Sequence, residues 1–233
     1  MTPESKSKSG EYWEQHVMSW EASAYFKDSG KPPTFWDRMS TLFRGQGMYV
    51  RMDAALQMVK LFVKDKVILD IGCASGRFAF QLMEAGAQKV IGVDVSPAAI
   101  EAANQKRLAS PYADRMEFKA MDLTQPDVVL PQVDLVTALG VIEYFDAPTL
   151  STLLGKFKTR YFFLDFPDAE GRTRNWLIWN LRQVYLQLNH CPGVYLFTQD
   201  EFRKMASQFG YTDLWFTRYS LFDYVSNLPV INA

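Results

Sequence analysis

Four residues in the stretch 67–94 have the types and spacing to hold a ligand that contains a nucleoside. Asp70 lies near the end of an apolar run that leads into Gly72 and Gly76. Asp94 ends a second apolar run, eighteen residues after Gly76. Glycines let a backbone approach a ligand where a Cβ would clash, and an acid ending the second strand of such a unit binds ribose hydroxyls. The pattern predicts a strand, a ligand-binding turn, a helix and a second strand.

The spacing within the glycine loop argues against a nicotinamide dinucleotide. The fingerprint G-x-G-x-x-G/A, counted from Gly72, requires small residues at positions 74 and 77. Ala74 is small, but position 77 is Arg77. The chain contains no G-x-x-x-x-G-K-[ST] sequence, which excludes a P-loop. An NAD-dependent oxidoreductase is therefore an alternative that matches its own fingerprint poorly.

The same stretch resembles the first motif of the class I S-adenosylmethionine-dependent methyltransferases, a strand and an acid followed by G-x-G-x-G. Ala74 replaces the middle glycine of that motif. Three more motifs follow in order up to residue 145, and they end in Gly140-Val141-Ile142-Glu143-Tyr144 at the active-site position. The resemblance implies S-adenosylmethionine (SAM) as cofactor and S-adenosylhomocysteine (SAH) as product. It implies these cofactor-binding residues: Asp70, Gly72, Cys73, Ala74, Gly76, Asp94, Val95, Met121, Asp122, Leu139 and Tyr25.

Several of these residues also have a purely structural interpretation. Asp70 suits a loop-capping acid, Asp94 a turn acid before the N-cap Ser96, and Asp122 an ordinary turn residue. Cys73 is interpreted as a small apolar packing residue rather than a nucleophile.

Glu143 and Tyr144 are the predicted catalytic residues, because they follow the fourth strand, where the methyl acceptor should lie. Glu143 could accept a proton or hold a cationic acceptor, and Tyr144 could orient a hydroxyl. Alternatively, Glu143 caps the next helix or forms an ion pair with a neighbour. The metal site of catechol-type relatives would need a carboxylate near the end of the fourth strand. Leu139-Gly140 supplies none, so no metal is predicted.

The acceptor is predicted to bind between aromatic residues near the N-terminus and an insert at 168–197. Aromatic faces suit the positive charge of a sulfonium. His190 and Arg174 lie in the insert. Alternatively, His190 is a solvated loop histidine and Arg174 belongs to a solvent-exposed helix face. The predicted substrate-binding residues are Tyr12, Trp13, Trp36, His190 and Arg174.

Hydrophobic patterning places these residues on an α/β fold. The prediction is a doubly wound, mostly parallel seven-stranded sheet (Rossmann-like methyltransferase fold) with an antiparallel C-terminal hairpin and an N-terminal helical lid. The expected domains are a disordered lead-in at 1–10, a helical lid at 11–63 and a catalytic domain at 64–233. Expected strands are 66–71, 89–94, 116–120, 133–139, 161–166, 211–217 and 221–226. Expected helices are 11–28, 35–43, 49–63, 75–86, 97–108, 147–158, 174–188 and one from the capping box Thr198-x-x-Glu201 to Gly210.

Composition narrows the function further. The formal net charge is −1, which offers no basic field for nucleic acid, and neither a [D/N/S]-P-P-[Y/F] segment nor a Pro-Cys nucleophile is present. Two distant cysteines suit a reducing compartment, and no apolar run approaches 18 residues. We therefore expect a cytoplasmic, monomeric or homodimeric biosynthetic enzyme that methylates O or N of a small metabolite. The alternatives are a methyltransferase acting on a protein or tRNA, and a non-catalytic cofactor-binding regulatory protein.

Overall fold

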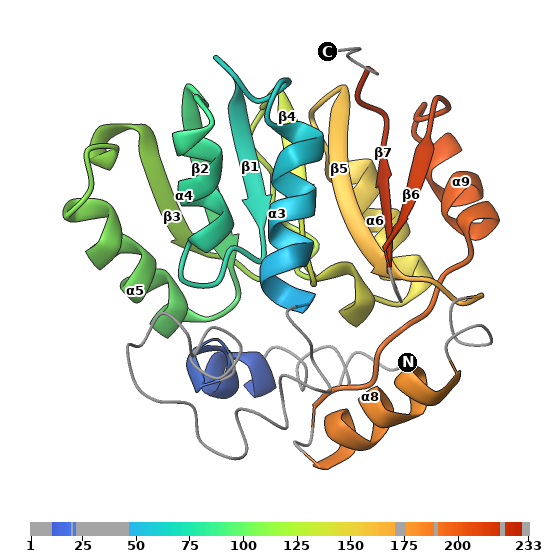
Figure 1. Ribbon diagram of the computed structural model, residues 1–233. Coiled ribbons are helices and arrows are strands. Elements are labelled where there is room, and N and C mark those ends of the chain that lie inside the picture. Colours follow the sequence, from blue (N-terminus) through green and yellow to red (C-terminus); the bar gives the residue numbers. More distant parts are fainter. Residues whose placement is uncertain are drawn as a thin grey trace.

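The computed structural model describes residues 11–19, 21, 47–170, 176–188, 191–219 and 222–229. Seven strands form one sheet in the order β3-β2-β1-β4-β5-β7-β6 (Figure 1). The first five strands in this order, β3, β2, β1, β4 and β5, pair in parallel. β7 pairs antiparallel with both β5 and β6. This confirms the predicted Rossmann-like sheet and its antiparallel end. The strands are β1 Val67–Ile71, β2 Lys89–Asp94, β3 Met116–Ala120, β4 Leu135–Ala138, β5 Tyr161–Pro167, β6 Trp215–Tyr219 and β7 Phe222–Ser226.

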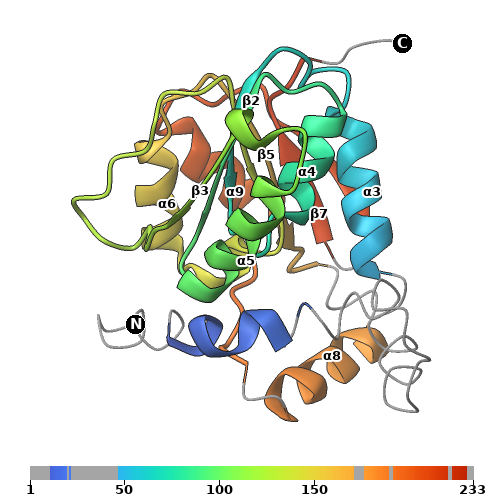
Figure 2. The same cartoon turned by 90° about the vertical axis from the view of Figure 1, so that its left-hand side faces the viewer.

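Helices cover both faces of the sheet (Figure 2). They are α3 Gly47–Val59, α4 Arg77–Glu84, α5 Pro97–Leu108, α6 Ala147–Lys156 and α9 Gln199–Ser207. A further helix, α8 Trp176–Leu188, lies beyond one edge of the sheet, and 3-10 turns occur at Ala113–Arg115 and Ile142–Tyr144. Successive side chains of a strand point to opposite faces. Ile68 therefore packs in the core under α3, α4 and α5, and Leu69 packs in the core under α6 and α9. Both are fully buried, which is why a central parallel strand reads as a continuous apolar run.

Local sequence signals explain most helix ends. The Ser96 side chain accepts a hydrogen bond from the Ala99 N–H at 3.3 Å and starts α5. The predicted capping box between Thr198 and Glu201 starts α9. The helix expected at 75–86 begins only at Arg77, because Gly76 has a left-handed φ of 84°.

Other bounds differ from expectation by a few residues. β4 is shorter than 133–139, β6 starts four residues later than 211, α9 ends before Gly210, and α3 occupies Gly47–Val59 rather than 49–63. The expected helix 11–28 is helical at residues 11–19 and 21, and its remainder, like the expected helix 35–43, lies outside the described residues.

Two helical segments lie beyond the carboxyl ends of the parallel strands. Figures 1 and 2 both show residues 11–19 and α8 beneath that edge of the sheet. These segments are far apart in the chain, and they lie on the side where open α/β sheets bind ligands. Within the described part of the chain, no helix has the length and apolarity needed to cross a membrane.

Candidate cofactor site

The loop after β1 is tied to the end of β2 by its own backbone. The N–H groups of Gly72 and Cys73 donate to the Val93 carbonyl at 2.7 and 3.1 Å. Gly72 has a φ of 68°, and a Cβ placed on it would lie 2.0 Å from a methyl carbon of Val141. Only glycine fits there, since both the backbone conformation and the space exclude a side chain. The predicted glycine loop is therefore formed by backbone close to the ends of β1 and β4.

Asp94 organises this loop from the end of β2. Its Oδ2 accepts a hydrogen bond from the Ala74 N–H at 2.9 Å, and its Oδ1 accepts one from the Ser96 N–H at 2.9 Å. Burial raises the pKa of Asp94, and the two backbone donors partly counteract this. Ala74 itself has a left-handed φ of 45°, a conformation that glycine adopts at lower cost. The geometry explains why this motif ordinarily has glycine at that position.

Asp70 is an acid with one unused oxygen. It is 2% exposed, and its Oδ1 accepts a hydrogen bond from the Thr137 hydroxyl at 2.8 Å. Its Oδ2 is buried and has no hydrogen-bond partner. Burial raises the pKa of Asp70 to about 7, although the Thr137 hydrogen bond lowers it. A buried carboxylate with a free oxygen favours a cationic ligand group.

Arg51 is a buried cation that the sequence analysis did not single out. It projects from α3, and its Nε forms an ion pair with Asp165 of β5, whose other oxygen accepts the Gly140 N–H at 2.7 Å. The Phe222 ring lies 3.8 Å below the guanidinium carbon. Nη2 of Arg51 is buried without a partner, and a Cβ on Gly140 would lie 3.8 Å from it. This donor therefore borders the carboxyl end of β4.

Electrostatics keep Arg51 charged. Burial lowers the pKa of Arg51, but the carboxylates of Asp165 and Glu143 outweigh burial and raise it. A sequence signal did exist for this pair. Asp165 stands within the buried apolar run of β5, and a charge there requires a partner.

The predicted catalytic residues lie in the 3-10 turn after β4. Glu143 is 5% exposed, and its carbonyl accepts the Tyr195 N–H at 2.7 Å. The Tyr144 ring lies 5.0 Å from the Trp13 ring at an angle of 66°. The turn thus contacts both the N-terminal helical residues and the part of the insert that follows α8.

The predicted acceptor residues are only partly within the described chain. Tyr12 and Trp13 lie on the helical residues 11–19, and the Tyr12 hydroxyl is 3.0 Å from Sγ of Cys191. Ser96 donates to the Glu14 carbonyl at 3.5 Å. Tyr25, Trp36, Arg174 and His190 lie outside the described residues.

The remaining predicted cofactor residues border the same edge of the sheet. The Met121 N–H donates to the Asp94 carbonyl at 2.8 Å. The Asp122 carboxylate accepts hydrogen bonds from the Thr124 N–H and hydroxyl and from Gln125, as an ordinary turn acid does. Cys73 is 6% exposed and packs in the core, and burial raises its pKa well above the usual value. Val95 and Leu139 are half-buried.

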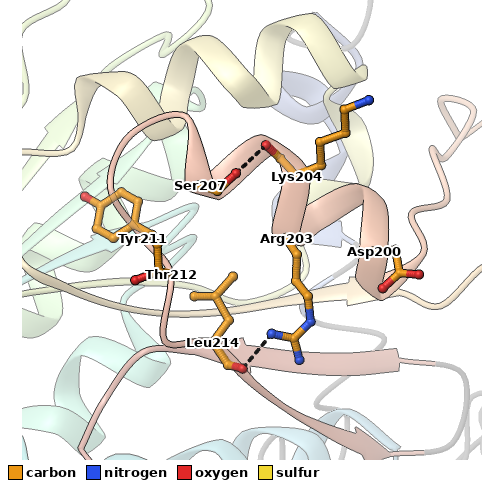
Figure 3. Close-up of a pocket in the computed structure, with 7 residues that line it drawn as sticks. All are labelled: Asp200, Arg203, Lys204, Ser207, Tyr211, Thr212 and Leu214. Carbon is orange, nitrogen blue, oxygen red and sulfur yellow. Dashed lines mark hydrogen bonds between the residues drawn. The ribbon is translucent and has the colours of Figure 1, made fainter.

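A cavity lies away from the candidate site, beside α9 (Figure 3). It measures about 430 Å³ and is lined by residues that include Arg203, Lys204 and Tyr211. Arg203 is engaged by the Leu214 carbonyl at 2.9 Å and by the Phe216 ring. None of the predicted site residues lines this cavity. Among the described residues, no cluster of His, Cys, Asp or Glu could hold a metal ion.

The seven-stranded sheet, the glycine loop after β1 and the acid at the end of β2 define a Rossmann-like methyltransferase fold. A solved structure with this fold is magnesium protoporphyrin IX methyltransferase from Synechocystis PCC 6803 with bound SAH. It is 19% identical, with a TM-score of 0.68, and the alignment covers 93% of this chain and 95% of that chain. At this identity the likeness establishes the fold alone.

Sequence comparison finds methyltransferases similar to part of the chain. Residues 68–160 match the family model described as a methyltransferase domain. The ribosomal protein L11 methyltransferase of Enterobacter sp. (strain 638) is 31% identical over 110 residues, and that of Haemophilus ducreyi is 35% identical over 115 residues. The matches span 47% of this chain but only 37% and 38% of those two proteins. The matched stretch contains the glycine loop, Asp94 and the turn after β4, which are the motifs that carry the resemblance to methyltransferases.

Proposed function

We propose that the protein transfers a methyl group from SAM to an oxygen or nitrogen atom of a small-molecule acceptor. One observation carries the cofactor assignment. Two buried groups of opposite charge at the carboxyl edge of the sheet each have one atom without a partner, Oδ2 of Asp70 and Nη2 of Arg51. Unpaired buried charges are costly. A ligand that ends in both an ammonium and a carboxylate, as SAM does, would satisfy both.

The other contacts suit the nucleoside part of the same ligand. Asp94 ends β2 beside the loop and still has free lone pairs beyond the two backbone bonds that it accepts. Its carboxylate would accept hydrogen bonds from the ribose hydroxyls. Gly72 keeps the loop backbone free of side-chain atoms. Arg77 is incompatible with the close helix start that a pyrophosphate requires, so a nicotinamide dinucleotide fits less well.

SAM supplies, when bound, an electrophilic methyl group on a sulfonium. The role of the protein is then to position the acceptor and exclude water, which lowers the entropic part of the barrier. Glu143 and Tyr144 are placed for this by the turn after β4. Glu143 would accept the proton that the acceptor loses, and Tyr144 would orient the acceptor. Trp13, in contact with Tyr144, would close the site against water.

Two of the comparisons bear on the class of acceptor. A small molecule is supported by the likeness to the protoporphyrin methyltransferase, which extends over nearly the whole of both chains. A protein acceptor is the second candidate, because the curated relatives are ribosomal protein L11 methyltransferases. Those matches cover little more than a third of the relatives, so they leave the acceptor-binding parts of those proteins unmatched.

Calorimetric titration with SAH, with NAD as the control ligand, tests the cofactor. We expect binding of SAH alone, and weaker binding by Arg51→Met and Asp70→Ala. Arg203→Met, on the distant cavity of α9, should bind as the wild type does. Binding of NAD but not SAH would refute the assignment.

Labelled SAM then tests the acceptor. The purified protein is incubated with a cell extract, and the extract is treated beforehand with protease or RNase in parallel samples. Label transfer that survives both treatments supports a small molecule. Transfer that protease abolishes would replace the proposal with a protein acceptor.

A further inference from the structure

Glu21 fastens the N-terminal helix, defined here as residues 11–19 and 21, to the glycine loop. Its side chain is almost wholly buried, and Oε1 accepts hydrogen bonds from the Ser75 hydroxyl and, at 2.8 Å, from Arg77 Nε. Oε2 faces the Ser75 N–H at 3.3 Å. Lys106 of α5 donates to the same Ser75 hydroxyl oxygen at 2.5 Å. Charge-assisted hydrogen bonds of this kind are about twice as strong as neutral ones.

The other end of the same helix contacts the acceptor side of the site. Trp13 packs edge-on against Tyr144 with ring centres 5.0 Å apart. The Tyr12 hydroxyl lies 3.0 Å from the sulfur of Cys191, in the part of the insert that follows α8. An α-helix rises about 1.5 Å per residue, so residues 11–19 extend over about 12 Å, and Glu21 follows two positions later. One helix therefore touches both halves of the site.

We propose that the Glu21 contact couples occupancy of the cofactor site to assembly of the acceptor site, with the N-terminal helix as the connection. The inference rests on the proposed function. A cofactor that orders the loop around Ser75 fixes the three donors that hold Glu21. When Glu21 is held in this way, the N-terminal helix keeps the Trp13 ring in contact with the Tyr144 ring. The acceptor site is complete only after the cofactor has bound, which imposes an order of cofactor first and acceptor second.

The charges at the loop fit this coupling. Burial raises the pKa of Asp94, and the nearby Glu21 carboxylate raises it further. The Glu21 carboxylate, which Arg77 pairs from the loop side, is thus a second acid near Asp94. A cationic cofactor would offset that repulsion. The closed helix is therefore favoured when such a ligand is present.

Hydrogen exchange without ligand tests the contact by itself. Glu21→Gln keeps the size of the side chain, but it replaces one acceptor atom with a donor that faces the donors of the loop. Loss of a buried charged hydrogen bond predicts amide exchange at residues 11–19 on the order of tenfold faster than in the wild type. Glu11→Gln, at an exposed position of the same helix, is the matched control and should exchange as the wild type does. Equal rates in Glu21→Gln and the wild type would overturn the contact.

Hydrogen exchange with saturating SAH tests the coupling. In the wild type we expect protection of the loop 72–76 and also of residues 11–19, 141–145 and 191–195. In Glu21→Gln we expect protection of the loop alone, at SAH concentrations that saturate the variant. Protection of all segments in the variant, or of the loop alone in the wild type, would refute the coupling. If the wild type does not bind SAH, the proposed function fails and the coupling with it, whereas the contact is still judged by the ligand-free experiment.

Discussion

Replacing Asp70 by Asn should stabilise the protein without ligand while weakening its binding of SAM. The pKa of Asp70 rises from 3.8 to about 7 on folding because the side chain is buried. Each pKa unit corresponds to about 1.4 kcal/mol, so an ionised Asp70 costs the folded state about 4 kcal/mol. Asn has no charge. Its carbonyl oxygen can still accept the hydrogen bond that the Thr137 hydroxyl donates to Asp70 at 2.8 Å.

The sign of the pH dependence follows from proton linkage. The folded protein binds the Asp70 proton more tightly than the unfolded chain does. The free energy of unfolding of the wild type should therefore fall as the pH rises from about 4 to about 7, and then level off. Asp70→Asn lacks this contribution. The stability gap between variant and wild type should widen through that window, toward an upper limit of about 4 kcal/mol above pH 7.

Urea unfolding at several pH values between 5 and 8, without cofactor, measures the gap. Asp114→Asn, at an exposed position in the turn before β3, is the control and should show no pH-dependent gap. A variant less stable than the wild type at pH 8, or a gap that does not change with pH, would refute the argument from burial. Calorimetry should also show that SAH binding to the wild type at pH 6.5 releases protons, because the ligand ammonium favours the ionised form of Asp70.

Three further predictions concern other residues. Asp165→Asn should cost about 3–5 kcal/mol of stability, because it leaves buried Arg51 without its partner; a loss below about 1 kcal/mol in urea unfolding would show that the ion pair is not needed. Ala74→Gly should stabilise the protein by about 0.5–1 kcal/mol by relieving a left-handed residue, whereas Ala102→Gly inside α5 should destabilise it by about 1 kcal/mol; opposite signs in thermal unfolding are the test. Thr198→Ala should cost about 1 kcal/mol by removing the cap of α9, and an unchanged unfolding midpoint would contradict the role of the capping box.

The parts of the site that could be predicted from the sequence are those formed by neighbouring residues. Asp70, Gly72 and Gly76 lie within one strand and the turn that follows it. A few consecutive residues therefore determine the conformation and the chemistry of that turn. Asp94 follows from the same unit, because a helix and a short strand fix its distance from the loop. The succession of strands and helices along the chain followed from the alternation of apolar runs and amphipathic segments.

The residues that were missed act through pairs far apart in the chain. Arg51 and Asp165 are separated by 114 positions, and Glu21 and Ser75 by 54. No periodicity connects such residues. Asp165 was detectable as a charge inside an apolar strand, but its partner was one of many cations. Glu21 resembled any other acid on an N-terminal helix, and only packing shows that it reaches the glycine loop.

The position of β7 has a consequence for how the protein is made. β7 is formed from residues 222–226, yet it lies between β5 and β6 and pairs with both. During synthesis the edge of β5 therefore stays unpaired until the chain has been translated through Ser226. An open strand edge is a site for pairing with other chains. Translation stalls or truncations before residue 222 should thus yield aggregation-prone nascent chains, although every residue of the glycine loop has by then been synthesised.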